Sequence, residues 1–481
     1  MNIVLSIDQG TTGTTVVAVD SDGKIVRKAY REIPQSFPKP GWVEHDPLTI
    51  LDSLRACISE ILKDGDLRPL AVGITNQRET ALIWNRISGQ PLCPAIVWQC
   101  RRTEEFCKIL TPHSKNIRDI TGLPVDAYFS ASKWHWMLEH HPEGQGEDWI
   151  AGTIDAWLIW NLTGEHLTDA TNASRTQLLD LEKVSWSKDM ADLFSIPISK
   201  LPTVRDSMSD YGTIRGLPGL DGVPILGVAG DQQAALFGQT CFDSGEVKNT
   251  YGTGAFLLMN TGSKRIHSEK GLISTLAVSR QGKACHALEG SVFICGAAIQ
   301  WLRDGLGILE NAPESEALAA SLSDNEGVYF VPALVGLGAP HWNGDARGLI
   351  TGLTRGTGRA HLVRAALEAM AFQSEDLLTS MENELGEKLN HIAVDGGACT
   401  NNLLMQFQAD ISCRNFHRPS QVESTALGAA FLAGLKAGFF ESPENLKQQR
   451  RLDRSFSPDM AVAERSRLLK GWNHALQQTL A

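Results

Sequence analysis

The hydrophobic pattern at the N-terminus predicts a β-hairpin. Residues 2–7 and 16–19 are mostly apolar, as in buried strands, whereas residues 8–14 between them (Asp-Gln-Gly-Thr-Thr-Gly-Thr) are polar. Glycine and hydroxyl-bearing residues at a hairpin tip can surround phosphate oxygens with backbone amides and hydroxyls. Such turns also occur without any ligand, so the hairpin alone leaves a plain turn and a phosphate loop as equal alternatives.

The same pattern recurs about half a chain later. Residues 246–250 and 255–259 are strand-like and enclose the short run Tyr-Gly-Thr-Gly. Two such hairpins indicate two halves of similar architecture, each offering a phosphate loop to a shared cleft. A chain of 481 residues is also long for a single domain. We therefore expect an N-terminal domain at residues 1–245 and a C-terminal domain at residues 246–481.

A strand-to-helix junction between the hairpins carries a lone acid. Residues 224–228 predict a short buried strand, residues 232–237 predict the start of a helix, and Asp231 lies between them. A carboxylate at this place could simply cap the helix. Gln232 and Gln233 follow it in an otherwise apolar segment, which favours a polar-lined pocket where Asp231 accepts a proton from a substrate hydroxyl.

Other strand ends carry polar or aromatic side chains. Arg78 and Glu79 follow a predicted strand, and a donor beside an acceptor suits a ligand with neighbouring hydroxyls. The commoner fate of adjacent charges is a surface ion pair. Trp98 ends another strand-like run, and Tyr128 is one of only five tyrosines. For both aromatic residues a place in the core is the ordinary role.

The C-terminal half contributes helix starts that are rich in glycine and alanine. Residues 296–301 open a helix with small residues, and residues 393–398 predict a strand and a glycine turn before a helix at 403–410. Such junctions can approach a nucleotide closely and present backbone amides, although glycine turns often serve only as turns. The apolar spacing over residues 361–385 predicts a long core helix.

Composition and motifs exclude several classes of function. A formal net charge of -11 argues against binding to nucleic-acid phosphates. The apolar stretch 428–440 is interrupted by Lys436 and is too short to span a bilayer. The nine cysteines form no C-x-x-C pair, and Met1 leads directly into a strand-like run, so we expect a cytoplasmic protein with reduced thiols. No G-x-x-x-x-G-K-(S/T) loop occurs, which disfavours a P-loop fold.

Taken in order, these segments resemble the FGGY carbohydrate kinases nearly from end to end. The segments that carry the resemblance are Asp8–Gln–Gly–Thr–Thr12, Pro38–Lys–Pro–Gly–Trp–Val–Glu–His–Asp–Pro47, Asn76–Gln–Arg–Glu–Thr80, Ile96–Val–Trp–Gln–Cys–Arg–Arg102, Gly227–Val–Ala–Gly–Asp–Gln–Gln–Ala–Ala–Leu–Phe–Gly238, Asn249–Thr–Tyr–Gly–Thr–Gly254, Gly336–Leu–Gly–Ala–Pro340 and Asp395–Gly–Gly–Ala398.

The resemblance implies an α/β fold of two actin-like (ribonuclease H-like) domains flanking a central catalytic cleft. The implied reaction is transfer of the γ-phosphoryl group of ATP to a terminal hydroxyl of glycerol, giving sn-glycerol 3-phosphate. Asp231 would be the general base, and Asp8 would orient Mg²⁺. A homodimer or homotetramer, with no nucleic-acid or membrane partner, would match the habit of the family.

The resemblance also implies two sets of binding residues. The glycerol hydroxyls and carbon chain would contact Arg78, Glu79, Trp98, Tyr128, Asp231, Gln232 and Phe256. The phosphates and the adenosine of ATP would contact Thr11, Thr12, Gly13, Thr15, Thr253, Gly296, Gln300, Ala398 and Asn402.

The chain departs from the family pattern in two places. Many members that act on glycerol continue Ser-Ser-Arg after the first five-residue motif, whereas Gly13, Thr14 and Thr15 follow here, so one phosphate-facing charge is missing and nucleotide affinity is expected to differ. Residues 214–223 contain neither the Gly–Arg loop linked to inhibition by fructose bisphosphate nor a histidine for activation by a phosphocarrier protein. We therefore do not expect activation by a phosphocarrier protein, and the sequence leaves allosteric regulation open.

Two alternative functions remain open from the sequence. A family member acting on a pentulose or another polyol would share the phosphate loops, but not the combination of Arg78, Glu79, Trp98 and Tyr128. An actin-like ATPase that works as a nucleotide-gated switch would share the fold and the hairpins. It would not need Asp231 beside a polyol pocket.

Overall fold

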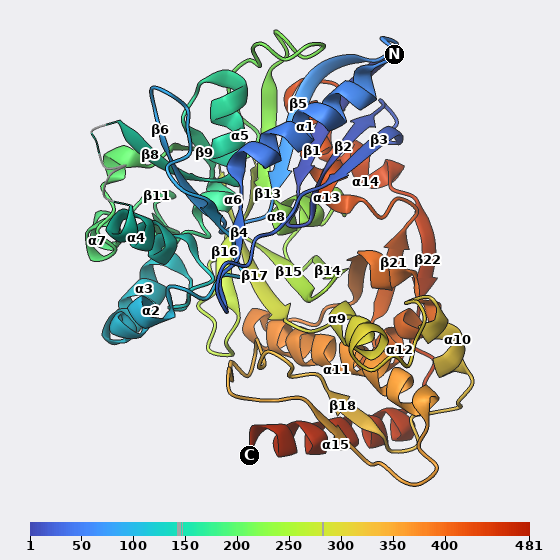
Figure 1. Ribbon diagram of the computed structural model, residues 1–481. Coiled ribbons are helices and arrows are strands. Elements are labelled where there is room, and N and C mark those ends of the chain that lie inside the picture. The colour runs from blue at the N-terminus through green and yellow to red at the C-terminus, as the bar shows by residue number, and fades with distance from the viewer. Residues whose placement is uncertain (142–145, 147, 281–282) are drawn as a thin grey trace.

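Two central sheets, one from each half of the chain, organise the molecule, and Figure 1 shows their arrangement in the computed structural model. The structure describes the whole chain except residues 142–145, 147 and 281–282. The first sheet contains, in spatial order, β13 (Ile225–Gly230), β5 (Arg68–Asn76), β1 (Asn2–Gln9), β2 (Gly13–Val19) and β3 (Ile25–Glu32). The second contains β16 (Ile273–Arg280), β17 (Lys283–Val292), β15 (Ala255–Gly262), β14 (Val247–Tyr251), β20 (His391–Asp395), β21 (Asn415–Pro419) and β22 (Leu452–Phe456).

The two central sheets repeat one strand topology. β1 pairs antiparallel with β2 and parallel with β5, and β5 is parallel to β13. In the same way β14 pairs antiparallel with β15 and parallel with β20, and β20 is parallel to β21. Both predicted hairpins are therefore confirmed, and each stands at the start of its half.

Smaller sheets and helices complete the fold. The remaining strands form a four-stranded sheet of β4 (Glu44–His45), β7 (Ala95–Ile96), β6 (Ala81–Asn85) and β8 (Trp149–Thr153), and the pairs β12 (Thr203–Arg205) with β9 (Leu167–Asp169), β10 (Leu179–Asp180) with β11 (Ser185–Trp186), and β18 (Tyr329–Val331) with β19 (Leu349–Thr351). The α-helices are α1 (Pro47–Leu62), α2 (Glu104–Ile109), α3 (Ser114–Thr121), α4 (Ser130–His140), α5 (Ile154–Thr163), α6 (Ala170–Ala173), α7 (Lys188–Leu193), α8 (Asp231–Gly238), α9 (Gly296–Gln300), α10 (Glu314–Ala320), α11 (Arg359–Leu385), α12 (Asn402–Ser412), α13 (Ser424–Lys436), α14 (Pro443–Gln449) and α15 (Val462–Leu480). Among the described residues, none of these helices combines the length and the apolar character needed to cross a bilayer.

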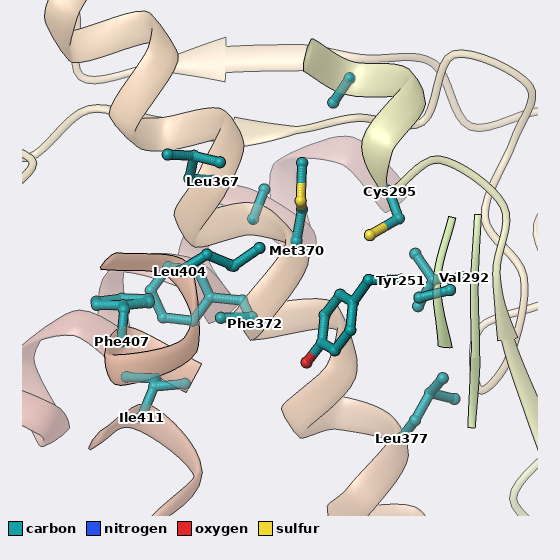
Figure 2. Packing of buried hydrophobic residues seen from close by; sticks show 14 of the residues in the cluster. Tyr251, Val292, Cys295, Leu367, Met370, Phe372, Leu377, Leu404, Phe407 and Ile411 are labelled. Carbon is teal, nitrogen blue, oxygen red and sulfur yellow. The ribbon is translucent and has the colours of Figure 1, made fainter. Parts of the chain in front are cut away.

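The long helix α11 is the centre of the core in the second half. The apolar spacing predicted residues 361–385, and the observed bounds are Arg359–Leu385. Figure 2 shows Met370 and Phe372 of this helix gathered with Phe407 of α12 and with Tyr251 at the end of β14. The ring of Phe372 also stacks on Trp472 of α15, with 5.1 Å between centroids. This packing supports the sheet that carries the second hairpin.

Helix α13 lies late in the chain but packs on the first central sheet. It contacts β13, β5 and β1, and it lies against α8, the helix that begins with Asp231. The division of the chain at residue 245 stays a prediction, because α13 belongs by sequence to the second half and by packing to the first sheet. The position of α8, and with it Asp231, therefore depends on a segment almost 200 residues away along the chain.

Gly428 allows the close approach of α13 to α8. A Cβ atom at this position would overlap the carbonyl oxygen of Ala234 in α8. We expect Gly428→Ala to push the two helices apart and to lower the free energy of unfolding by about 1–3 kcal/mol. Thermal unfolding of the variant checks this, with Gly344→Ala as the control, because a Cβ there would meet nothing within 4 Å. An unchanged melting temperature for Gly428→Ala would contradict the prediction.

Candidate active site

Neighbouring parallel strands bring three of the predicted site residues to one edge of the first sheet. Asp8 is near the end of β1, Arg78 follows β5, and Asp231 follows β13. Asp231 is the first residue of α8 rather than its N-cap, which is Gly230. Its Oδ1 accepts the backbone N–H of Gln232 at 2.7 Å and lies 3.1 Å from Nε of Arg78. Its side chain is 30% exposed, so the carboxylate remains accessible to a substrate hydroxyl.

Arg78 and Glu79 do not form a surface ion pair, since both side chains are only 2% exposed. Each is held by a charged residue from elsewhere in the chain. Nη1 of Arg78 donates to Oε2 of Glu289 at 2.5 Å, and Oε1 of Glu79 accepts from Nε of Arg175 at 2.6 Å. Arg175 in turn donates through Nη2 to Oε1 of Glu289 at 2.9 Å. Arg175 and Glu289 were missed by sequence reasoning.

The backbone at Glu79 adopts a conformation that residues other than glycine rarely take. Its φ angle is +59°, and Thr80 N–H donates to the carbonyl oxygen of Arg78 at 2.7 Å, closing a tight turn. Ser130 Oγ donates to the Glu79 carbonyl at 3.1 Å and helps to hold the turn. Strained backbone of this kind persists where the surroundings determine it, most often at functional sites. The turn therefore presents neighbouring side chains, a donor and an acceptor, in a fixed geometry.

The pKa values of the buried charges indicate which are ionised. Burial raises the pKa of Glu289, but Arg175 and Arg78 outweigh burial and lower it to about 2. Burial acts to lower the pKa of Arg78, but Glu289, Glu79 and Asp231 raise it well above its ordinary value. Glu289 is therefore a carboxylate and Arg78 a guanidinium cation at neutral pH.

Aromatic side chains stand beside these charges. Trp98 and Tyr128 are half-buried and meet edge to face, with ring centroids 5.6 Å apart. The indole Nε1 of Trp98 donates to Oγ1 of Thr11 at 2.9 Å, which joins the aromatic wall to the first hairpin tip. Arg175 lies over the Tyr128 ring, 5.8 Å from its centroid.

The second sheet contributes Phe256 and Lys248 to the same region. Phe256 is half-buried in β15, and its carbonyl accepts from Nζ of Lys248 at 3.2 Å. Nζ of Lys248 also donates to Oε1 of Gln232, the residue after Asp231. Burial lowers the pKa of Lys248 to about 8, against the opposing effect of Asp395 and Asp231. Lys248 thus connects the second hairpin to the start of α8.

Asp8 suits a hard metal cation. Burial, and then the neighbouring carboxylate of Asp231, raise the pKa of Asp8 to about 8, so its charge lacks sufficient compensation from the protein. A bound cation would provide that compensation. The described residues contain no group of three or more candidate ligands. A lone carboxylate such as that of Asp8 fits Mg²⁺, which is commonly held by one or two carboxylates together with waters and substrate phosphates.

The first hairpin tip is closed by its own backbone, with Gly10 N–H donating to the Gly13 carbonyl at 2.9 Å. Thr12 at the tip is exposed, and Thr11 is partly so. Gly13 is buried, and a Cβ there would collide with the ring of Tyr30. The glycine is therefore required for packing beneath the tip. Thr15 lies opposite Asp8 in the β1–β2 register.

The second hairpin tip rests on the start of α9. The carbonyl oxygen of Thr253 accepts the N–H groups of Cys295 at 2.9 Å and Ala297 at 3.0 Å, and Gly252 accepts that of Gly296 at 3.0 Å. These amides hold the tip, and they leave the Thr253 side chain exposed.

The residues predicted for adenosine lie on elements next to the second hairpin, namely α9 and the segment after β20, the strand that pairs with β14. Gly296 and Gln300 are the first and last residues of α9, and Gln300 is exposed. Ala398 lies in the turn after β20, and Asn402 begins α12, where its Oδ1 accepts from Nη2 of Arg418 at 3.0 Å.

The sequence contains a weak indication of Glu289, Lys248 and Arg175, the charged site residues that were not predicted. Glu289 lies in the buried part of β17, and Lys248 is the one charged residue of β14, a strand that is almost entirely buried. Arg175 follows the short helix α6 in a buried polar segment. A lone charge in a buried strand needs a partner, but its sequence does not identify that partner.

Comparisons with known proteins agree with this architecture. The model of the FGGY family of carbohydrate kinases, N-terminal domain, matches residues 3–238, and that of the C-terminal domain matches residues 247–437. A glycerol kinase from Stenotrophomonas maltophilia is 50% identical to this chain, over 99% of the chain and 98% of the relative. Glycerol kinase 2 from Thermotoga maritima is 49% identical, over 100% and 99% respectively.

A solved structure gives the same result in three dimensions. The crystal structure of Plasmodium falciparum glycerol kinase with ADP superposes with a TM-score of 0.94 at 39% identity, covering 100% of this chain and 99% of that one. The predicted fold of two actin-like α/β domains is confirmed by these relatives. Matches of this extent, in sequence and in structure, show that the chain belongs to the FGGY family of carbohydrate kinases.

Proposed function

We propose that this protein phosphorylates glycerol with ATP, giving sn-glycerol 3-phosphate and ADP. The observation that carries the proposal is the set Arg78, Glu79 and Asp231 beside the aromatic pair Trp98 and Tyr128, in a chain about half identical to proteins named glycerol kinases over its whole length. Paired donors and acceptors suit adjacent hydroxyls, and aromatic rings suit the carbon chain between them.

Asp231 would act as the general base. Its carboxylate would accept the proton of a terminal glycerol hydroxyl while that oxygen forms a bond to the γ-phosphorus and the bond to the β-phosphate oxygen breaks. Arg78, whose Nε is 3.1 Å from Oδ1 of Asp231, would donate to a glycerol oxygen beside the base. Asp8 would hold Mg²⁺, which would neutralise part of the phosphate charge.

The remaining residues of the glycerol set would fix the orientation of the acceptor. Glu79 would accept a hydrogen bond from another hydroxyl, and Gln232 would accept or donate one. Phe256 would complete the apolar wall with Trp98 and Tyr128. An acceptor that lacked one of these hydroxyls would leave buried polar groups unpaired, which is a strong source of selectivity.

The two hairpin tips would hold the phosphates of ATP. Thr11, Thr12, Gly13 and Thr15 would contribute from the first tip and Thr253 from the second. Gly296, Gln300, Ala398 and Asn402 would line the adenosine. Phosphoryl transfer depends mainly on such positioning and on charge neutralisation, and closure over the substrates would exclude water as a competing acceptor.

The proposal is tested by ADP formation from Mg-ATP with glycerol, dihydroxyacetone, xylulose, ribulose or no acceptor. We expect strong turnover that depends on glycerol. A clear preference for a pentulose would contradict the substrate while keeping the chemistry. Equal ADP formation without any acceptor would support the ATPase-switch alternative and overturn the proposal.

Three further expectations stay predictions. These are the homodimer or homotetramer, the cytoplasmic location, and the division into domains at residues 1–245 and 246–481. Light scattering of the purified protein tests the first of them. Sensitivity to fructose bisphosphate, which the sequence leaves open, is tested by adding it to the glycerol assay.

A further inference from the structure

A row of alternating charges, buried except for Asp231, runs through the candidate site. Its members, in spatial order, are Asp231, Arg78, Glu289, Arg175 and Glu79. The side chains of the three inner members, Arg78, Glu289 and Arg175, are 0–2% exposed. Glu289 lies 2.5 Å from Arg78 and 2.9 Å from Arg175. The row begins at the proposed base and leads through Glu289 to Glu79, which would accept a hydrogen bond from a glycerol hydroxyl. Oε1 of Glu79 also lies 3.8 Å from Nε of Arg78.

Glu289 differs from the other members in its origin. The others follow or belong to elements of the first half, whereas Glu289 is on β17 of the second central sheet. In the β15–β17 register, Glu289 is opposite Leu258, and Ser291 is opposite Phe256. Since side chains two residues apart share a face of a sheet, Glu289 and Phe256 lie on the same face. The second sheet thus sends both an aromatic wall residue and a carboxylate towards the site.

We propose that Glu289 is a positioning residue for the acceptor, which holds Arg78 directly and Glu79 through Arg175 in the geometry that binds the glycerol hydroxyls. The inference rests on the proposed function and deepens it. Glu289 itself would not touch glycerol, because both of its oxygens are engaged by the two guanidinium groups.

The geometry requires a carboxylate at this position. Each oxygen of Glu289 accepts from one arginine, and an amide would replace one acceptor with a donor that faces a guanidinium donor. One arginine would then lose its partner in a fully buried place and would have to turn. Arg78 would keep Asp231 at 3.1 Å, Gln233 at 3.2 Å and the more distant Glu79 at 3.8 Å, and its movement would displace the donor that binds the hydroxyl.

The test compares Glu289→Gln with the native enzyme in steady-state kinetics. We expect the KM for glycerol to rise about 10–100-fold, because the contact to a hydroxyl is misplaced, while the KM for ATP stays within twofold. The matched control is Glu368→Gln, a buried glutamate in α11 that pairs with Arg364 at 2.7 Å. It should leave the KM values for both substrates near those of the native enzyme.

A purely structural role would give a different result. The proposal would be overturned if the KM values for glycerol and for ATP rose together. It would also be overturned if Glu289→Gln lowered only kcat, and only as far as a control variant with the same loss of melting temperature does. If Glu289→Gln does not fold, Glu289→Asp serves instead. Aspartate keeps the charge, but its shorter side chain moves the carboxylate away from the two arginines. It should raise the glycerol KM by a smaller factor, and an unchanged glycerol KM would overturn the proposal. If the native enzyme shows no glycerol-dependent turnover, the proposed function fails by itself.

Discussion

Asp231→Asn is expected to lower kcat for glycerol phosphorylation by about 10²–10⁴-fold, the range of a positioned general base. The amide keeps the size of the side chain but cannot accept the hydroxyl proton. Asp231 begins α8, and its Oδ1 would still accept the N–H of Gln232, so the helix should form. Purified variant and native enzyme are compared by ADP formation at saturating glycerol and ATP.

The control for Asp231 is Asp189→Asn. Asp189 is an exposed acid in the first turn of α7. Like Asp231 it lies at the start of a helix, but it is outside the candidate site. It should retain native kcat. If Asp231→Asn kept more than a tenth of the native kcat while remaining folded, Asp231 would not be the base.

Asp8→Asn is expected to lower kcat by about 10²–10³-fold at ordinary Mg²⁺ concentrations. Metal coordination and neutralisation of phosphate charge contribute several kcal/mol to such reactions, and an amide is a weaker ligand for Mg²⁺ than a carboxylate. Activity titrated with Mg²⁺ should reach half its maximum at a higher concentration in the variant. Asp22→Asn, in the exposed turn after β2 of the same sheet, should titrate as the native enzyme does.

The same variant should be more stable than the native protein when the metal is removed with EDTA. Burial and Asp231 raise the folded-state pKa of Asp8 to about 8, above its ordinary value of 3.8. The folded protein therefore binds the proton more tightly than the unfolded chain, so the ionised carboxylate destabilises the fold as pH rises. The stability difference in favour of Asp8→Asn should grow between about pH 4 and pH 8. Melting temperatures across this range test it, and a native protein more stable than the variant at pH 8 would contradict it.

Several elements of this protein depend only on local chemistry and could be predicted from the order of its residues. The strands around both hairpin tips, the helix that starts at Asp231 and the long helix α11 were predicted close to their observed bounds. These elements follow from local patterns: apolar alternation in strands, apolar spacing in helices and the preference of glycine for turns. Each pattern extends over only a few residues, so it can be recognised in the sequence. The motif resemblance then gave the family and the candidate residues.

The contacts that hold those residues in place come from distant parts of the chain and could not be predicted in this way. Adjacent charges in a sequence usually mean a surface pair, yet Arg78 and Glu79 are buried by partners 211 and 96 residues away, Glu289 and Arg175. Helix α13 likewise crosses from the end of the chain to support α8. Ion pairing and close packing depend on which strands and helices become neighbours. The sequence around a buried charge therefore does not identify the partner that neutralises it.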